Sequence, residues 1–255
     1  MPDLLPSSSL PPPLVTPPAR AVAASFQARF SGVTAGSFLL LLLWDFSSLD
    51  LAMAHWFGSA SGFARESHWL WRTWLHDDLR LWPWALELYL LAGVFLPLGH
   101  LKRLPRARRA QLAVSTLAAL LVVSAIKRYS HTSCPWDLQA FGGAAAYVSH
   151  WAWGLRDGGG GGCFPAGHAS AGFAFVGGFF AFRRALPATA WRWLAGSLLA
   201  GLVLGLAQQV RGAHYMSHTL WTAWLCWTVA GGVDGAVSWL TARSRSPAPA
   251  PAPGF

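Results

Sequence analysis

Apolar residues dominate six stretches of the chain, and the segments between them are more polar. The stretches cover about residues 33–55, 82–99, 110–126, 167–182, 192–210 and 215–240. Most of them approach the roughly 20 residues that a helix needs to cross a bilayer. Several contain glycine and other small residues, which allow helices to pack closely in lipid. The pattern predicts an all-α fold, an integral membrane protein built as a bundle of six transmembrane helices.

Basic residues between these stretches predict how the bundle is oriented. They precede the first stretch and follow the second, fourth and sixth stretches: Arg20, Arg29, Lys102, Arg103, Arg106, Arg108, Arg109, Arg183, Arg184, Arg192, Arg243 and Arg245. Cytoplasmic loops of membrane proteins collect Lys and Arg. With six spans, all these segments fall on one side. We therefore expect a multi-pass protein of a bacterial inner (plasma) membrane with both termini cytoplasmic and with loops 56–81, 127–166 and 211–214 in the periplasm.

Composition agrees with a membrane protein and argues against a nucleic-acid partner. Hydrophobic residues make up 54% of the chain, and charged residues make up only 11%, against about 25% in soluble domains. The net charge of +9 is confined to short inter-span segments, which indicates topology rather than a phosphate-tracking surface. Proline-rich ends predict disordered tails at residues 1–28 and 242–255 around one domain at 29–241.

Three polar segments lie at span ends on the predicted outer face. Lys127 ends the third span, His168 opens the fourth within CFPAGHAS, and RGAHYMSH joins the fifth span to the sixth. Ionisable groups at membrane depth are costly and are therefore candidates for function. Because the three segments share one side, we expect a single site to collect their side chains.

These side chains suit phosphoryl transfer through a phosphohistidine. A neutral imidazole is a competent nucleophile near neutral pH, and a second imidazole can protonate the leaving oxygen. Backbone N–H groups at Ala166 and Gly167, at the start of a helix, can hold a phosphate oxygen. His214 and His218 are four residues apart and share a helix face, so His218 is expected to hydrogen-bond His214 and fix its tautomer.

With these motifs, the sequence resembles the type 2 phosphatidic acid phosphatase superfamily, whose members include bacterial acid phosphatases and vanadium haloperoxidases. That superfamily has the motifs K-x6-R-P, P-S-G-H and S-R-x5-H-x3-D in this order, and the resemblance covers about residues 110–235. It implies that His214 is the nucleophile, His168 the general acid and Lys127 a phosphate ligand. It also implies no metal and no cofactor.

The motifs depart from the superfamily pattern at four positions. Cys134 stands for the first arginine, and Ala166 for the serine. Gln208 stands for the second arginine and His218 for the aspartate. Arg211, about one helical turn after Gln208, is expected to replace the missing arginine as a phosphate ligand.

The outer loop contains two of the three cysteines, Cys134 and Cys163. In an oxidising periplasm this pair is expected to form a disulfide that braces the PAGH segment; the alternative is two free thiols. The GGGGG run at 158–162 predicts a flexible hinge in the same loop. His150, by contrast, is expected at the protein surface or at the membrane interface.

The function expected from this sequence is hydrolysis of a lipid phosphate or pyrophosphate at the periplasmic face. Candidate substrates are phosphatidic acid, phosphatidylglycerol phosphate, undecaprenyl pyrophosphate and the phosphates of lipid A. Transfer of the phosphoryl group to another acceptor remains open, as does a zinc hydrolase in which His168 joins the pair His214 and His218. A haem-binding or transport protein is the non-enzymatic alternative. The sequence does not indicate an oligomeric state.

Overall fold

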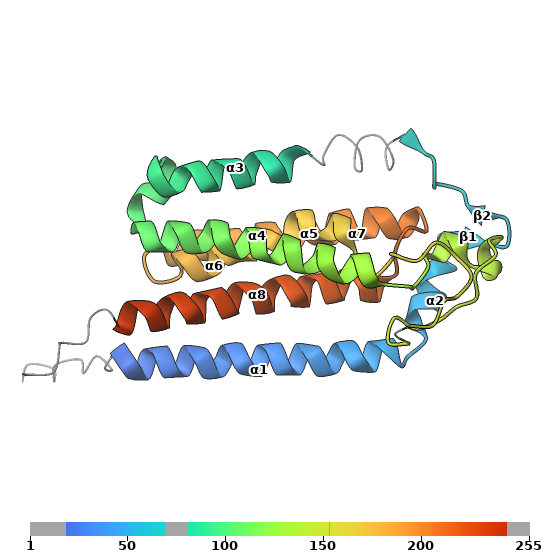
Figure 1. Ribbon diagram of the computed structural model, residues 1–255, viewed down its shortest axis with the longest axis horizontal. Coiled ribbons are helices and arrows are strands. Elements are labelled where there is room, and N and C mark those ends of the chain that lie inside the picture. Colours follow the sequence, from blue (N-terminus) through green and yellow to red (C-terminus); the bar gives the residue numbers. More distant parts are fainter. Residues whose placement is uncertain (1–18, 70–80, 153, 244–255) are drawn as a thin grey trace, which may run out of the picture.

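The computed structural model describes residues 19–69, 81–152 and 154–243. Almost all of its regular structure is helical, with one two-stranded hairpin (Figure 1). The elements are α1 (Ala19–Asp45), α2 (Leu49–Ala54), β1 (Gly58–Ser59), β2 (Gly62–Phe63), α3 (Leu81–Phe95), η2 (Gly99–Arg103), α4 (Arg106–Tyr129), η3 (Pro135–Asp137), η4 (Gln139–Phe141), α5 (Gly167–Phe173), η5 (Ala174–Val176), α6 (Gly177–Phe182), α7 (Pro187–Val210) and α8 (Met216–Arg243).

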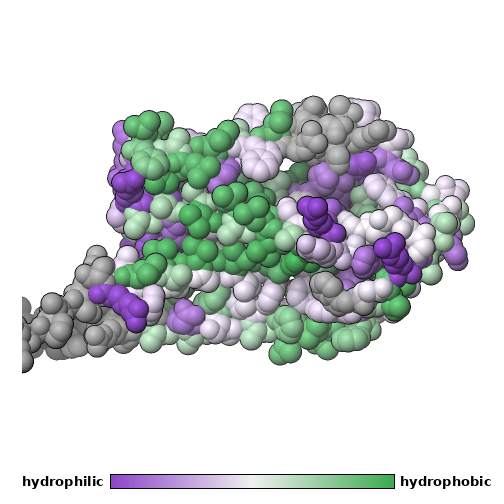
Figure 2. Space-filling model, viewed as in Figure 1, coloured by the Kyte–Doolittle hydropathy of each residue, from purple (hydrophilic) through white to green (hydrophobic). Residues whose placement is uncertain are grey.

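Within the described residues, four helical segments are long and apolar enough to cross a membrane: Ala24–Asp45, Leu81–Arg103, Arg106–Tyr129 and Pro187–Val210. The predicted fourth stretch is a shorter apolar segment, Gly167–Phe182. The predicted sixth stretch is α8, whose 28 residues extend over about 42 Å at 1.5 Å per residue. Large apolar side chains such as Leu40, Leu43 and Leu199 are exposed on α1 and α7, as expected for lipid-facing helices. Figure 2 shows the hydrophobic surface over the helices and more polar atoms at the end with the loops.

The long helices lie side by side, and α4 and α8 form the centre of the bundle (Figure 1). α4 packs on α3, α6 and α8, and α1 packs on α8. α5 and α7 approach so closely that a Cβ on Gly172 would collide with the backbone of Gly201. Small residues at such a contact allow two helices to pack in lipid, where burial of apolar surface gives little driving force.

α1 begins at Ala19, so helix extends into the segment 1–28 that was expected to be a disordered tail. Residues 19–28 are rich in alanine, the best helix former, and two aromatic side chains fix this part of the helix. Phe26 packs on the ring of Phe180, and Phe30 packs on Phe180 and Trp227. The rest of the two expected tails, residues 1–18 and 244–255, lies outside the described residues.

A buried group of charges joins α4, α6 and α8 at the end of the bundle that carries the α6–α7 turn. Asp234 on α8 accepts hydrogen bonds from Arg108 (2.6 Å) and Arg183 (2.8 Å) and from the amide of Gln111 (3.1 Å). Asp234 is only 4% exposed. Buried charges of this kind need such partners, because an unpaired ion in the interior is strongly unfavourable.

Candidate functional site

The three polar segments singled out in the sequence meet at one end of the bundle, where α4 ends, α5 begins and α7 turns into α8 (Figure 1). The side chain of Lys127 lies against Gly167, since a Cβ placed on that glycine would be 3.5 Å from Lys127 Cδ. The backbone N–H of Ala166 donates to the carbonyl of His218 (3.3 Å), and Thr222 Oγ1 donates to the carbonyl of Ala166 (3.2 Å). The PAGH segment is therefore fixed between α4 and α8.

The Ala166 contact corrects one expectation. Because its N–H donates to the carbonyl of His218, this group is not directed at a phosphate oxygen. Gly167 is the first residue of α5 and does not share that contact. Of the two backbone N–H groups that were expected to hold a phosphate oxygen, only that of Gly167 stays a prediction.

His214 lies in the short connection between α7 and α8 and is 5% exposed. Its Nδ1 is 3.5 Å from Sγ of Cys163. Burial lowers the pKa of His214 well below its ordinary value, and the charges of Lys127, His218 and His168 lower it further. The imidazole is therefore neutral near pH 7. Because Nδ1 faces Cys163, Nε2 is the nitrogen left to act as a nucleophile.

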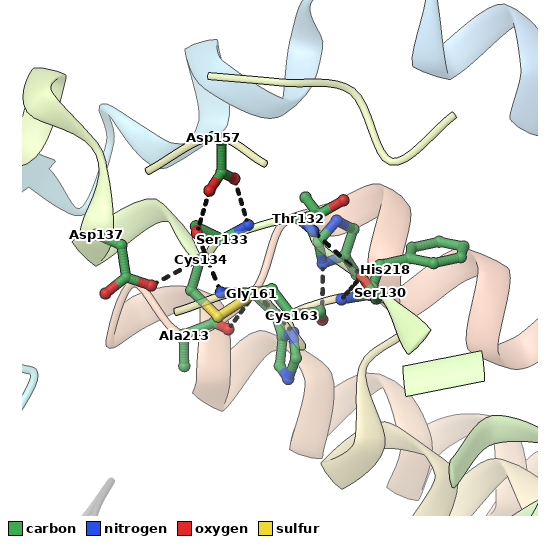
Figure 3. The surroundings of a disulfide bond; sticks show 12 residues. Ser130, Thr132, Ser133, Cys134, Asp137, Asp157, Gly161, Cys163, Ala213 and His218 are labelled. Carbon is green, nitrogen blue, oxygen red and sulfur yellow. Dashed lines mark hydrogen bonds between the residues drawn. A yellow bond between two sulfur atoms is a disulfide. The ribbon is translucent and has the colours of Figure 1, made fainter. Parts of the chain in front are cut away.

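His218 has a different partner from the one expected. Its Nδ1 lies 3.1 Å from the carbonyl oxygen of Cys163 (Figure 3), and its ring centroid is 5.9 Å from that of His214 in an edge-to-face arrangement. The expected hydrogen bond from His218 to His214 is therefore replaced by one to the backbone of Cys163. A single residue, Cys163, thus contacts both histidines of the RGAHYMSH segment.

The structure joins Cys134 and Cys163 by a disulfide, with their Cα atoms 5.2 Å apart (Figure 3). Backbone hydrogen bonds from Cys163 to Thr132 (2.9 Å) and from Gly162 to Ser130 (2.8 Å) pair the same two segments. The outer loop is thereby tied to the residue that contacts His214 and His218.

The glycine run is a packed turn rather than the expected hinge. Asp157 accepts hydrogen bonds from the N–H (2.7 Å) and the hydroxyl (2.6 Å) of Ser133 and from the N–H of Gly159 (3.0 Å). Burial raises the pKa of Asp157, but these hydrogen bonds outweigh it and the pKa lies below its usual value. Gly161 has φ +64° and Gly162 has φ +67°, a region that residues with a Cβ rarely adopt.

We expect reduction of the Cys134–Cys163 disulfide to lower the free energy of unfolding by about 3 kcal/mol, because the bond closes a loop of 29 residues. Thermal unfolding in detergent, with and without reductant, measures this change. The double variant Cys134→Ser/Cys163→Ser is the matched control, since reductant should no longer change its unfolding temperature. Equal unfolding temperatures for the oxidised and reduced wild type would contradict the prediction.

Arg211 is buried and lies at the end of α7. Its Nε donates to the carbonyl of Glu66 (2.9 Å), and one of its Nη atoms donates to Oε1 of Gln208 (3.2 Å). Its guanidinium also lies 5.8 Å from the ring centroid of Trp136. These contacts tie the loop after the hairpin to the site. The neighbouring Gly212 has φ +78°, and a Cβ there would collide with the ring of Phe63.

Two acidic residues that were not expected in the site, Asp45 and Asp50, accept hydrogen bonds from residues around it. Asp50 accepts hydrogen bonds from the N–H (3.0 Å) and the hydroxyl of Ser217, and so caps the first turn of α8. Asp45 accepts from the indoles of Trp151 (2.8 Å) and Trp221 (2.9 Å). These two residues could have been noticed in the sequence, because carboxylates that directly follow an apolar run are costly near a membrane and therefore indicate a function.

His150 was expected at the surface or at the membrane interface, and the structure packs it into the outer loop with only 6% of its side chain exposed. Its ring stacks on Phe164 with centroids 4.1 Å apart, and Nε2 lies 3.4 Å from Asp45. It also packs edge-to-face on His218 with centroids 5.7 Å apart. Only long-range packing of the loop against α1 and α8 produces this position, so no local pattern predicts it.

The described residues contain one convergent group of possible metal ligands, formed by Cys134, Cys163 and His214. Their ligand atoms lie within 4.8 Å of one another. Because the two sulfurs are joined to each other, they are not thiolates, the form that binds zinc. This group is different from the set of three histidines that the zinc alternative requires.

Comparison with known families identifies the chain. The family model of the PAP2 superfamily matches residues 109–242. Searches of curated proteins and of solved structures gave no significant match. The matched segment is more than half of the chain and contains α4 to α8 with Lys127, His168 and His214. The chain belongs to the PAP2 superfamily.

Proposed function

We propose that this protein is a membrane-embedded phosphatase that hydrolyses a lipid phosphate or pyrophosphate through a phosphohistidine on His214. Membership in the superfamily supports phosphatase activity on phosphate esters. The observation that carries the proposal is the meeting of the buried His214 with Lys127 and the PAGH segment at one end of the bundle. Burial and the nearby charges of Lys127 and His168 lower the pKa of His214. That environment favours a nucleophile and a bound phosphate at the same place.

In the proposed mechanism, Nε2 of His214 attacks phosphorus and forms the N–P bond. The bond to the leaving oxygen breaks, and His168 donates a proton to that oxygen. Water then attacks the phosphohistidine while His168, now neutral, accepts its proton. The N–P bond breaks, and inorganic phosphate and the starting enzyme are released. Lys127 and the N–H groups at the start of α5 stabilise the charge on the non-bridging oxygens.

We further propose that α5–α6 and α8 complete six membrane crossings with the four longer apolar segments. The basic residues of η2 and of the α6–α7 turn lie at the end opposite His214 (Figure 1). Under the positive-inside rule this end is cytoplasmic, which puts both termini in the cytoplasm and the site in the periplasm. Oxidising conditions there suit the Cys134–Cys163 disulfide.

Phosphate release from a panel of lipids tests the proposed function. We expect the purified protein to release phosphate from at least one of phosphatidic acid, phosphatidylglycerol phosphate, undecaprenyl pyrophosphate and lipid A. A rapid quench during turnover should trap phosphate on the protein in an acid-labile, base-stable form, as expected for phosphohistidine. Absence of phosphate release from every lipid would refute lipid hydrolysis, and an acid-stable phosphoprotein would refute the intermediate.

The pH dependence of this activity follows from the environment of His214. Because its pKa is depressed, the nucleophile stays neutral as the pH falls through 6.5, the ordinary value for histidine. The acid limb of kcat/KM should therefore lie below pH 6.5. Replacement of Lys127 by methionine removes a cation that lowers this pKa. The acid limb of kcat/KM measured for the Lys127→Met variant should therefore lie at higher pH than in the wild type.

A matched control for the pH profile is Lys102→Met, an exposed lysine on η2 at the opposite end of the bundle. Its profile should coincide with that of the wild type. An acid limb above pH 6.5 in the wild type, or an unchanged limb in Lys127→Met, would contradict the proposed environment of His214.

A further inference from the structure

A long groove separates α3 from α5 and α7 and has a volume of about 1000 Å³. Leu86 lies on the α3 side, and Phe175, Gly196 and Val203 lie on the other side. Among the described residues, the lining of the groove comes from α3, η2, α5, η5 and α7, and α3 itself packs on α4. The lining is largely apolar along the length of the spans.

The charged and titratable groups of the groove lie at one end. Arg192 near the start of α7 and His100 on η2 are both exposed, and Thr189 lies three residues before Arg192 on α7. Arg192 makes no hydrogen bond or ion pair with any residue that the structure describes. At the other end the lining consists of residues without charge, including Trp82 and Leu204. The charged end is the one at which α7 starts, and the α7–α8 connection that contains His214 lies at the opposite end of the bundle (Figure 1).

The dimensions of the groove fit one leaflet of a bilayer. From Arg192 to Val203, α7 rises by eleven residues, or about 16 Å at 1.5 Å per residue. Half of the hydrocarbon core of a bilayer is about 15 Å thick. A lipid with its head at Arg192 would therefore extend its acyl chain as far as Val203. A cation at the head position and apolar walls beyond it are complementary to an acidic phospholipid.

We propose that the α3–α7 groove is a binding site for an acidic phospholipid of the leaflet opposite the catalytic site. Its phosphate contacts Arg192 and His100, and one acyl chain lies between α3 and α7. This lipid fills the space that separates α3 from α7. The site goes beyond the proposed phosphatase reaction and rests only on the membrane insertion of the bundle.

The test measures lipid retention and does not require activity. Protein in detergent is incubated with equimolar phosphatidylglycerol and phosphatidylcholine, and bound lipid is counted by native mass spectrometry. We expect the wild type to retain phosphatidylglycerol preferentially. Since one arginine near a membrane surface contributes about 1 kcal/mol to anionic lipid binding, Arg192→Gln should lower that retention about fivefold. Arg29→Gln, an exposed arginine on α1, is the matched control and should bind as the wild type does.

A second variant tests the acyl-chain part of the groove. Gly196 faces open space, with no atom within 4 Å of an added Cβ, so Gly196→Leu fills the groove without strain. It should lose retention of both lipids. Gly232→Leu on α8 also faces open space but lies outside the groove and should leave retention unchanged.

Three results would overturn the proposal. They are equal retention of the two lipids by the wild type, retention of phosphatidylglycerol by Arg192→Gln at the wild-type level, and retention by Gly196→Leu at the wild-type level. If Gly196→Leu instead raises KM for a long-chain lipid phosphate while Arg192→Gln changes neither retention nor KM, the occupant is the chain of the substrate. A failure of the phosphatase assay would leave these binding results unaffected.

Discussion

Replacement of His214 by glutamine is expected to lower phosphate release by a factor on the order of 10³ or more, because it removes the atom that bonds to phosphorus. Glutamine keeps a polar side chain at a buried position, so the variant should fold. Initial rates of phosphate release from the best lipid of the panel, together with the unfolding temperature in detergent, measure both properties. The trapped phosphoprotein should disappear in parallel.

Two comparisons make this result specific. His55→Gln, the same change at an exposed histidine directly after α2, should keep wild-type activity. His168→Gln should lose about 10²–10⁴-fold, the range for a general acid, and should lose less on p-nitrophenyl phosphate, whose leaving group needs little protonation. If His214→Gln keeps more than a tenth of the wild-type rate, His214 is not the nucleophile.

The second large effect concerns stability. Asp234→Asn should lower the free energy of unfolding by about 3–5 kcal/mol, the range for breaking a buried ion pair from one side. The asparagine leaves the guanidinium groups of Arg108 and Arg183 without their carboxylate. Unfolding in detergent, followed by circular dichroism, measures the change.

Restoration of the charge balance should recover part of this loss. Removal of one cation in Asp234→Asn/Arg108→Gln should make the double variant more stable than Asp234→Asn alone, because fewer buried charges remain unpaired. Glu66→Gln is a control at an exposed carboxyl group and should change stability by less than about 0.5 kcal/mol. A loss below 1 kcal/mol in Asp234→Asn would show that the buried pairs contribute little.

The helices and the meeting of the three polar segments were predictable from the sequence. Long apolar runs are the strongest sequence signal of helices in a membrane. The alternation of basic loops placed Lys127, His168 and His214 on the same side, and the structure brings their segments together. The two histidines do lie near each other, with ring centroids 5.9 Å apart, but His214 precedes the start of α8 at Met216, so they do not share the helix face that was expected.

The partners of these histidines could not be predicted in the same way. The sequence favours a contact between His214 and His218, yet His218 contacts the carbonyl of Cys163. A backbone carbonyl has no residue-type signature, so no motif reports its position. The position of Cys163 depends in turn on the disulfide and on the packed glycine turn around Asp157.

Ion pairs between helices that are distant in the sequence could not be predicted either. The sequence predicts only a cytoplasmic position for Arg108 and Arg183, because the positive-inside rule already explains their presence. Their partner Asp234 lies more than fifty residues from Arg183 and more than a hundred from Arg108. His150 shows the same difficulty, because its burial depends on contacts with Asp45 and Phe164 from two other parts of the chain.

The cap that Asp50 places on α8 limits how small a working unit of this protein can be. Residues 109–242 match the superfamily, but Asp50 and the Glu66 carbonyl that receives Arg211 both come from the preceding part of the chain. A fragment trimmed to the matched segment would start its last helix without the Asp50 cap, two residues before His218. The part of the chain that precedes the matched segment therefore supports the end of the bundle that carries His214, and a minimal version of the protein should retain it.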